Sequence, residues 1–563
     1  MATTPSGNRF NPLDLIEWAG NKLPDPAMLF VWASLIVIAL SAVGGSMKWS
    51  VQPVRPEAVM REVTDPATGE LRQEPVLDEN GRKTVRLVDV GVPIEAKSLV
   101  TSEGIFWMLR TMVKNFVDFP PLGVVVVTML GVGLAERAGL VGALLKAVML
   151  IIPPRLFTPM LVLLGIQSSM GADSGYVVLP PIAAILFKSV GRSPLAGVAA
   201  VFCGISAGFS SNLLITSLDP LLSGLTETGA RVIEPGYVVN AACNWWFMIA
   251  STFLLTLIGW AVTDWFVEPR LARRAPEDGG AAVGDTSALR AERLSSGEMR
   301  ALAKAGVVFA AGLTLVLALI FSKGSPLYGD ALPISKSARW IVAIVPIIMG
   351  LFLFPGIAYG VSVGSIRSGR DIARLMSDSL ATTAPVFVLA FFAGQFIAYF
   401  KYSQLDQLLA YSLGKMLAES QLSPLLLLAA FIVLVMVLNI LVSSASAKWT
   451  LLAPVFVPIF MLLQISPELT QVAYRLADSC TNIVTPLNAY LVLLLAVCQK
   501  YAPRAGTGTI ISMMTPYSIA FAVIWTIFLL GWVALGFDLG IDGGLEYAPP
   551  AAADVAPAAP SAG

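Results

Sequence analysis

The stretch Leu441-Val-Ser-Ser-Ala-Ser-Ala-Lys-Trp-Thr-Leu-Leu-Ala-Pro454 places four hydroxyls, a lysine and a tryptophan inside a long apolar run. A similar stretch lies far upstream, Ser168-Ser-Met-Gly-Ala-Asp-Ser-Gly-Tyr-Val-Val-Leu-Pro180, and both contain paired serines and end at a proline. In that register Asp173 stands opposite Lys448. A second polar interruption follows each copy: Ser210-Ser-Asn212 and Cys480-Thr-Asn482. The pattern predicts two copies of one membrane unit whose four polar interruptions meet at one site.

The composition is typical of a polytopic membrane protein. Of the 563 residues, 56% are hydrophobic and 13% are charged, and the apolar residues come in runs near the length that spans a bilayer. The 37 basic and 37 acidic residues cancel, so we expect no nucleic-acid partner. The sequence has no histidine and no P-loop motif, which argues against an enzyme, a metal cofactor or an ATP-driven pump. Four cysteines in apolar segments are expected to be small buried hydrophobes: Cys203, Cys243, Cys480 and Cys498.

Two membrane repeats joined by a charged linker are expected. The predicted divisions are a polar segment at 1–24, a first repeat at 25–266 with an extramembrane segment at 46–103, a linker at 267–304, a second repeat at 305–536 and a disordered tail at 537–563. The linker is assigned to the cytoplasm because residues 268–304 contain seven Arg and Lys side chains. Alternating pieces such as residues 84–88 predict short strands in the extramembrane segment.

Two re-entrant helical hairpins are predicted at the polar interruptions. The run from Leu156 to Gln167 makes a helix of about 18 Å, too short for a hydrocarbon core about 30 Å thick. Because the chain returns after the polar tip, the first hairpin is placed around 156–190, with its tip buried in protein. The second is placed around 430–465, although its first arm is long enough to span. The fold class is therefore an all-α polytopic membrane protein built as an inverted-repeat secondary transporter.

Three other segments carry structural predictions. Phe106 to Phe119 has charged residues at helical spacing and is expected to lie along the membrane interface. Gly204-Ile-Ser-Ala-Gly208 matches a serine-nucleophile string, but inside an apolar helix it predicts a small-residue packing surface. A helix broken in its middle is expected from Glu468 to Val497.

Oxygen-bearing side chains of the second interruptions suit a hard cation. Amide and hydroxyl oxygens from both repeats make a candidate sodium site: Ser210, Ser211, Asn212, Thr481 and Asn482. The alternative for any one of them is a hydrogen bond to a nearby backbone carbonyl. If protons are the coupling ion, the carrier must be a carboxylate, since the chain has no imidazole.

Four ionisable residues in the membrane region require a reason, because each costs roughly 3 kcal/mol on insertion scales. They are Asp173, Lys448, Arg475 and Asp478. In one interpretation Arg475 and Asp478 pair at i, i+3 on one helix. In the other, Arg475 or Lys448 receives a substrate carboxylate, an aspartate carries or senses the coupling ion, and Trp449 offers an aromatic face. Trp449 alone is equally compatible with core packing.

Four segments resemble the AbgT family of p-aminobenzoyl-glutamate transporters: Ser168 to Pro181, Gly204 to Asn212, Ser444 to Trp449, and Ala477-Asp-Ser-Cys-Thr-Asn-Ile-Val-Thr-Pro486. The resemblance covers nearly the whole chain. The resemblance implies a homodimer in the bacterial inner membrane, with about nine spanning helices and two opposed hairpins in each protomer. It implies coupling to sodium or protons, and uptake or efflux of p-aminobenzoyl-glutamate, p-aminobenzoate and sulfonamide-type antimetabolites. The family's functional positions fall on Asp173, Asn439, Ser446, Trp449, Pro467, Arg475, Asp478 and Pro486, and Lys448 joins them from the repeat comparison.

Other function classes remain open from the sequence. A sodium-coupled dicarboxylate importer shares hairpin architecture, and competition between succinate and p-aminobenzoyl-glutamate separates the two. A passive channel would conduct without either ion gradient. A membrane enzyme is the weakest alternative, since no metal or nucleophile constellation is present.

Overall fold

The computed structural model describes residues 26–64, 71–76, 85–169, 174–281, 294–331, 338–382, 384–420, 422–485, 487–488 and 490–548. Within these ranges the chain is mostly helical, and nine helices are long and apolar enough to span a membrane. They cover Ala27–Ser46, Ser102–Arg137, Trp245–Ala272, Ser296–Phe321, Ile344–Val363, Ala384–Tyr402, Pro424–Leu441, Ala445–Leu462 and Thr507–Ala534. The predicted all-helical, multi-span fold is confirmed.

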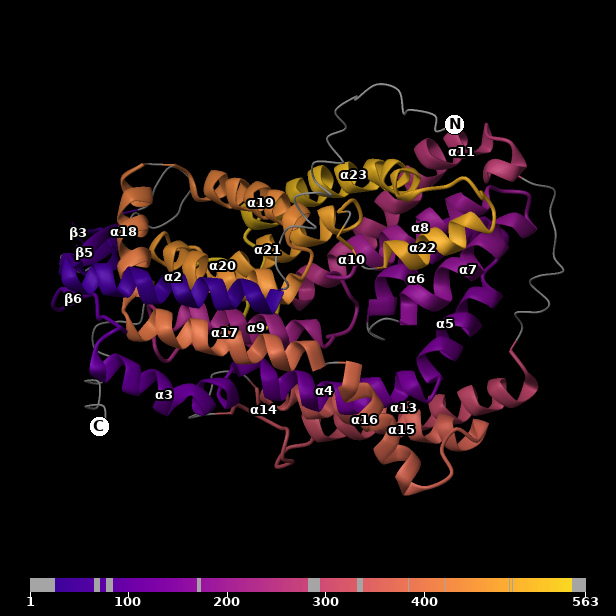
Figure 1. Ribbon diagram of the computed structural model, residues 1–563, viewed down its shortest axis with the longest axis horizontal. Coiled ribbons are helices and arrows are strands. Elements are labelled where there is room, and N and C mark those ends of the chain that lie inside the picture. The colour runs from indigo at the N-terminus through magenta and orange to yellow at the C-terminus, as the bar shows by residue number, and fades with distance from the viewer. Residues whose placement is uncertain are drawn as a thin grey trace, which may run out of the picture.

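Six short strands follow the first helix, α2 (Pro26–Ser46), and pair in three antiparallel ladders. The pairs are β1 (Ser50–Val51) with β6 (Ile94–Glu95), β2 (Val54–Ala58) with β5 (Val85–Asp89), and β3 (Met60–Thr64) with β4 (Leu71–Pro75). The predicted strand at residues 84–88 is β5. We call this end of the molecule, at the left of Figure 1, the strand end.

Seven helices recur in the same order in the two halves. The first set is α4 (Pro120–Arg137), α5 (Leu140–Ile151), α6 (Phe157–Ser168), α7 (Ser174–Ser189), α8 (Pro194–Ala207), α9 (Leu218–Ala230) and α10 (Trp245–Val262). The second set is α17 (Ala384–Tyr402), α18 (Leu405–Glu419), α19 (Pro424–Leu441), α20 (Ala445–Leu462), α21 (Pro467–Asn482), α22 (Leu491–Gln499) and α23 (Thr507–Ala534). In each set a hairpin precedes a helix that is interrupted by a polar stretch.

The remaining elements surround these sets or connect them. They are α3 (Ser102–Val117), η1 (Pro154–Leu156), the π-helical turn η3 (Thr263–Val267), α11 (Glu268–Ala272), η4 (Pro276–Asp278), α13 (Ser296–Phe321), α14 (Arg339–Val342), α15 (Ile344–Val363) and α16 (Gly369–Thr382). Helices α13, α15, α4 and α16 pack together along one side (Figure 1). The α11 end is called the linker end.

Where the two sets meet, each hairpin packs against a helix of the other set. In the first hairpin, α7 packs against α22 of the other set, and Tyr176 stacks on Tyr490 with 3.7 Å between ring centroids. In the second hairpin, α20 packs against α9 of the first set. Figure 1 shows α20 and α9 near the strand end, and α7 and α22 at the opposite end. This reciprocal packing is what two repeats related by a two-fold axis produce.

The hairpins enter from opposite ends of α10. At the base of the first, Arg192 donates to Asp264 of η3 at 2.6 Å, just beyond the end of α10. At the base of the second, Ser466 N–H donates to Leu545 at 3.1 Å, and the same C-terminal segment accepts from Phe247 at the start of α10 at 2.9 Å. Since α10 and η3 together extend about 34 Å, the two bases lie on opposite sides of the membrane region.

The C-terminal segment corrects the predicted tail. Residues 537–548 belong to the fold, because they join the base of the second hairpin to the loop before α10. Tyr547 N–H donates to Gln464 at 3.0 Å, and Ile541 N–H donates to Ala242 at 3.1 Å. The predicted tail, 537–563, therefore starts too far upstream, because the low-complexity sequence begins only near residue 548. Residues 549–563 lie outside the described residues, as do 1–25.

The second hairpin has the longer first arm that the sequence indicates, whereas α9 of the first interrupted helix was not expected. The arms α19 and α20 have 18 residues each, whereas α6 has 12, and the longer arms contact through Phe431 with Phe456 and Phe460. The sequence did not reveal α9 or the amphipathic α16. The interface assignment of Phe106 to Phe119 stays a prediction. Residues up to Val117 form α3, which is followed by α4 within one apolar stretch, Ser102–Arg137, that is long enough to span a membrane.

Small residues let α6 and α8 approach closely, as predicted for Gly204 to Gly208. A Cβ atom on Gly204 would lie 2.3 Å from the carbonyl oxygen of Val162, and one on Gly165 would lie 2.4 Å from that of Val201. The four cysteines are buried and free, as expected. The close crossing fixes the first hairpin against α8.

We predict that Gly204→Ala destabilises the protein, because the added methyl group forces α6 and α8 apart at a cost of about 1–3 kcal/mol. The measurement is the thermal unfolding midpoint of the purified protein in detergent. Gly306→Ala in α13 is the matched control, since a Cβ there meets nothing within 4 Å. An unchanged midpoint for Gly204→Ala would contradict the close crossing.

Candidate functional site

Helix α21 forms the centre of the candidate site. Every residue from Pro467 to Cys480 is buried, although the helix carries Glu468, Gln471, Arg475 and Asp478. Pro467 takes the first helical position, where a missing N–H costs nothing, and the Ser466 hydroxyl accepts from Leu469 N–H at 3.0 Å. Because buried polar groups need partners, the other helices must supply them.

The second hairpin tip supplies the partners of Asp478. Lys448 of α20 forms an ion pair with Asp478, and both side chains are at most 3% exposed. The Lys448 ammonium also donates to the side-chain oxygen of Asn439 and, at 2.7 Å, to the carbonyl of Val442. Asn439 in turn donates to the backbone carbonyl of Asp478 and to Thr481 at 2.9 Å. The second hairpin tip is therefore held to α21 by the ion pair of Lys448 with Asp478 and by the hydrogen bonds of the Asn439 amide.

Arg475 is bound to the first repeat and not to its helix neighbour. Its guanidinium donates to Asp219 at 2.7 Å and to the carbonyl of Ser210 at 2.8 Å. The second carboxylate oxygen of Asp219 accepts from the Thr216 N–H at 2.6 Å and the Thr216 hydroxyl at 2.8 Å. The predicted i, i+3 pairing of Arg475 with Asp478 is wrong, because each of them has a buried partner on another helix.

Asp219 is the site residue that the sequence reasoning missed. A signal was present: Thr216-Ser-Leu-Asp219 has the threonine and acidic residue spacing of a helix N-terminus, and α9 begins there. That pattern predicts a cap, but it gives no sign that the carboxylate also receives an arginine from the other repeat.

Trp449 is fully enclosed by protein. Its indole N–H donates to Thr226 of α9 at 2.9 Å, and its ring stacks on Tyr474 of α21 with 4.4 Å between ring centroids and 24° between ring planes. The Tyr474 hydroxyl donates to the carbonyl of Ala445 at the hairpin tip. At 0% exposure, Trp449 offers a face to a ligand only after α20 and α21 move apart.

The first hairpin tip contacts the first polar interruption. The Ser169 hydroxyl donates to Asn212 at 2.8 Å, and Gln167 accepts from the N–H of Leu213 at 3.3 Å. Asp173 at this tip and Pro486 after α21 lie outside the described residues. The four polar interruptions are thus joined in part, through Arg475 to Ser210 and through Asn482 of α21, which donates to Ser206 of α8 at 3.1 Å.

The candidate sodium residues lie in separate groups. Asn212 bonds to Ser169 and Phe209, whereas Thr481 bonds to Asn439, and Ser211 donates to the carbonyl of Gly208. The described residues contain no cluster of three Cys, Asp or Glu side chains that could hold a metal ion. The Arg475 guanidinium also donates to the Ser210 carbonyl, where its positive charge would repel a cation. The sodium site stays a prediction.

One side of the second tip borders open space. Ser446 is half-buried and lies 3.4 Å from Ser444, hydroxyl to hydroxyl. Both serines line a cavity of about 310 Å³ with Ala27 of α2 and with Pro385, Val386, Val388 and Leu389 of α17. This cavity adjoins the hairpin tip that carries Lys448 and Trp449, so it gives a small molecule a place to approach the buried charges.

Two cations and two carboxylates are therefore buried together at the contact of the repeats. Each cation is neutralised by a protein carboxylate: Lys448 by Asp478, and Arg475 by Asp219. A ligand with two carboxylates can compete with both, and the aromatic pair of Trp449 and Tyr474 lies beside them. The arrangement suits an aromatic ligand that carries negative charge.

Comparison with known proteins gives consistent matches along the chain. Residues 11–547 match the model of the AbgT putative transporter family. The p-aminobenzoyl-glutamate transport protein of Escherichia coli (strain K12) is 31% identical over 541 residues, covering 96% of this chain and 98% of that protein. The structure of the Alcanivorax borkumensis YdaH transporter has a TM-score of 0.78 at 36% identity and covers 92% of this chain and 100% of that chain. The structure of Neisseria gonorrhoeae MtrF, which is described among antimetabolite efflux pumps, has a TM-score of 0.80 at 37% identity and covers 93% of this chain and 97% of that chain.

We predict that Asp219→Ala destabilises the protein by about 3–5 kcal/mol, since it leaves the Arg475 guanidinium buried without a counter-charge. The measurement is thermal unfolding in detergent. Replacing both partners by apolar residues, Asp219→Leu with Arg475→Met, removes the buried charge and should restore most of the stability. The surface pair of Lys415 and Asp89 is the control, because Asp89→Ala should leave the unfolding midpoint unchanged. A double variant less stable than Asp219→Ala would contradict this assignment.

Proposed function

Since the chain belongs to the AbgT family of transporters, we propose that it moves p-aminobenzoyl-glutamate and related aromatic carboxylates across the bacterial inner membrane. The E. coli relative is a p-aminobenzoyl-glutamate transport protein, which supports the substrate class. The description of MtrF supports efflux of antimetabolites, including sulfonamides, as a second direction of use. A sodium or proton gradient would drive the movement, and the working unit would be a homodimer.

The observation that carries the proposal is the buried pair of cations beside an aromatic stack. p-Aminobenzoyl-glutamate has a benzoyl ring, an amide and two carboxylates, so its groups match Trp449, Asn439, Lys448 and Arg475 in kind. Each cation is at most 3% exposed on its side chain and is held by a protein carboxylate. A substrate carboxylate that replaces Asp478 at Lys448 keeps the lysine paired, and the buried charge stays balanced when the coupling proton or sodium ion binds Asp478 at the same time.

Entry of the substrate requires the second hairpin tip to leave α21. In the closed arrangement Asn439, Lys448 and the Tyr474 hydroxyl join the tip to α21, and Trp449 is covered. Separation of the tip breaks these contacts and exposes the indole face toward the cavity that Ser446 lines. The tip of the second hairpin therefore serves as one gate, and the oppositely directed first hairpin as the other.

A gated carrier fits this interior better than a passive channel. Helix α21 is buried from Pro467 to Cys480; Arg475 is paired with Asp219 of the first repeat, and Asp478 with Lys448 of the second hairpin. Ions or solutes can pass such a core only when contacts between elements break, which gives one transport event for each conformational cycle.

We predict that Lys448→Gln and Asp478→Asn each reduce transport of labelled p-aminobenzoyl-glutamate into proteoliposomes by at least about tenfold, because each breaks the exchange of buried charges. Sodium and pH gradients are imposed separately, so the same assay identifies the coupling ion. Lys415→Gln removes an exposed lysine that pairs with Asp89 and should leave transport unchanged.

The competing functions have their own outcomes in this assay. Transport of labelled succinate that p-aminobenzoyl-glutamate does not inhibit would replace the proposal with a dicarboxylate importer. Flux that persists without either gradient, with no counterflow, would indicate a channel. Transport at the parental rate by a well-folded Lys448→Gln variant would remove Lys448 from the site.

A further inference from the structure

A second polar network leads away from Trp449 along α21. The Thr226 hydroxyl accepts from the Trp449 indole at 2.9 Å and donates to the side-chain oxygen of Gln471 at 2.6 Å. Gln471 donates to Asn244 at 2.7 Å, and Asn244 donates to the backbone carbonyl of Glu468 at 3.0 Å. All these side chains are buried. The network joins the aromatic part of the site to the first turn of α21.

Glu468 at the end of this network is a buried carboxylate without a cation. It is 3% exposed, and none of the ion pairs among the described residues involves it. The Tyr237 hydroxyl lies 3.1 Å from each of its oxygens. Burial of a carboxylate away from positive charge favours its neutral form. Arg475 lies two turns further along α21, where Asp219 already binds it.

The surroundings of Glu468 add negative charge. Asp542 of the C-terminal segment acts on it as a like charge, and the Cys243 thiol lies on the loop before α10. Glu234 accepts from Tyr547 at 2.9 Å on the far side of Tyr237. No neighbouring element described here presents a lysine or arginine to the carboxylate. The first turn of α21 and the Tyr237 hydroxyl offset part of the negative charge, and a proton is the compensation that removes the rest.

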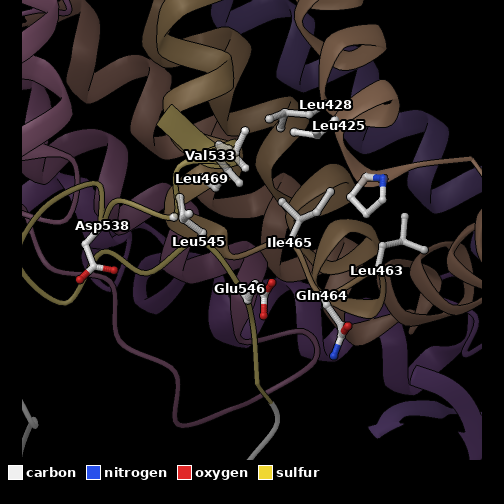
Figure 2. Close-up of a pocket in the computed structure, with 13 residues that line it drawn as sticks. Leu425, Leu428, Leu463, Gln464, Ile465, Leu469, Val533, Asp538, Leu545 and Glu546 are labelled. Carbon is white, nitrogen blue, oxygen red and sulfur yellow. The ribbon is translucent and has the colours of Figure 1, made fainter. Parts of the chain in front are cut away.

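Tyr237 is the contact of Glu468 that leads toward the strand end. Tyr237 is part of the partly exposed loop between α9 and α10, and burial together with Glu468 raises the pKa of its phenol, so it remains a hydrogen-bond donor. A cavity of about 420 Å³ lies beside the first turn of α21, with Ile465 and Leu469 in its wall. Figure 2 shows Leu425, Leu428 and Val533 on one side of this cavity and Gln464 and Glu546 at the opposite edge.

We propose that Glu468 is a proton-binding site that couples proton uptake at the strand end to the state of the substrate site. The inference rests on the proposed transport function and extends it to a residue outside the positions of the substrate site. One proton from solution binds one carboxylate oxygen, and the site changes from negative to neutral.

The coupling follows from the change in hydrogen bonding. The carboxylate only accepts, so Tyr237 can donate to either oxygen; in the protonated acid one oxygen carries the proton and donates, which leaves Tyr237 one favoured acceptor and gives the new O–H a need for an acceptor of its own. Two protonation states therefore favour two arrangements of the first turn of α21. The same helix carries Arg475 and Asp478, and the network through Gln471 reaches Trp449, so both arrangements act on the gate.

The test uses the full-length protein in proteoliposomes, with Glu468→Gln as the principal variant and Glu546→Gln as the matched control at the cavity edge. An imposed pH gradient should accelerate parental transport, and the control should behave likewise. The parental acceleration by the pH gradient is expected to be on the order of tenfold, and Glu468→Gln should lose it. The variant should still exchange substrate by counterflow when the pH is equal on both sides. Parental acceleration in a folded Glu468→Gln variant would overturn the proposal.

Tyr237→Phe keeps the carboxylate and removes its donor, so the test stands even if Glu468→Gln does not fold. Loss of a hydrogen bond to the charged form should move the pH midpoint of transport upward by about one unit. An unshifted midpoint would count against Glu468. Infrared titration of the purified protein gives a readout without substrate: a carboxylic acid band should titrate in the parental protein and be missing in Glu468→Gln. A band unchanged in the variant would refute the proton site, whereas absent p-aminobenzoyl-glutamate transport by the parental protein would refute only the proposed function.

Discussion

A helix with buried charges inside an apolar bundle is the constraint on which the rest of the structure depends. Because α21 is enclosed from Pro467 to Cys480, its ionised side chains must find compensation on other elements, and Glu468, which has no cation nearby, is favoured in its neutral form. Arg475 finds Asp219 and the Ser210 carbonyl in the first repeat, and Asp478 finds Lys448 on the second hairpin. The requirement for charge balance thereby ties three separate parts of the chain to one helix, and any movement of those parts must preserve that balance.

The exchange of helices between repeats gives this core its symmetry. Each hairpin packs against the second half of the other repeat's interrupted helix: α7 against α22, and α20 against α9. Since the hairpin bases lie at opposite ends of α10, the two tips approach the centre from opposite directions. A displacement that loosens one tip can leave the other in place, which is the geometry that alternating access requires.

The sequence predicted the parts that periodicity and repetition determine. The two hairpins, the interruption of α21 and the close crossing at Gly204 follow from run lengths, polar breaks and small residues. Partner choice did not follow, because spacing on a helix brings Arg475 and Asp478 near one another without revealing that Asp219 and Lys448 lie closer. The enclosure of Trp449 by Tyr474 and Thr226 depends on contacts between distant segments, which a local pattern cannot show. Helix α9 was missed because glycine, threonine and acidic residues weaken its apolar signal.

The C-terminal segment from Leu539 to Tyr547 has a consequence for biosynthesis. It is translated after every helix that it joins, yet its backbone connects Ser466 and Gln464 to the start of α10. A Cβ atom on Gly540 would lie 2.3 Å from the carbonyl of Ala242, so the two backbones pack closely at this junction. Insertion of the preceding helices into the bilayer can begin before this segment is made, but the junction between α10 and the second hairpin can close only afterwards.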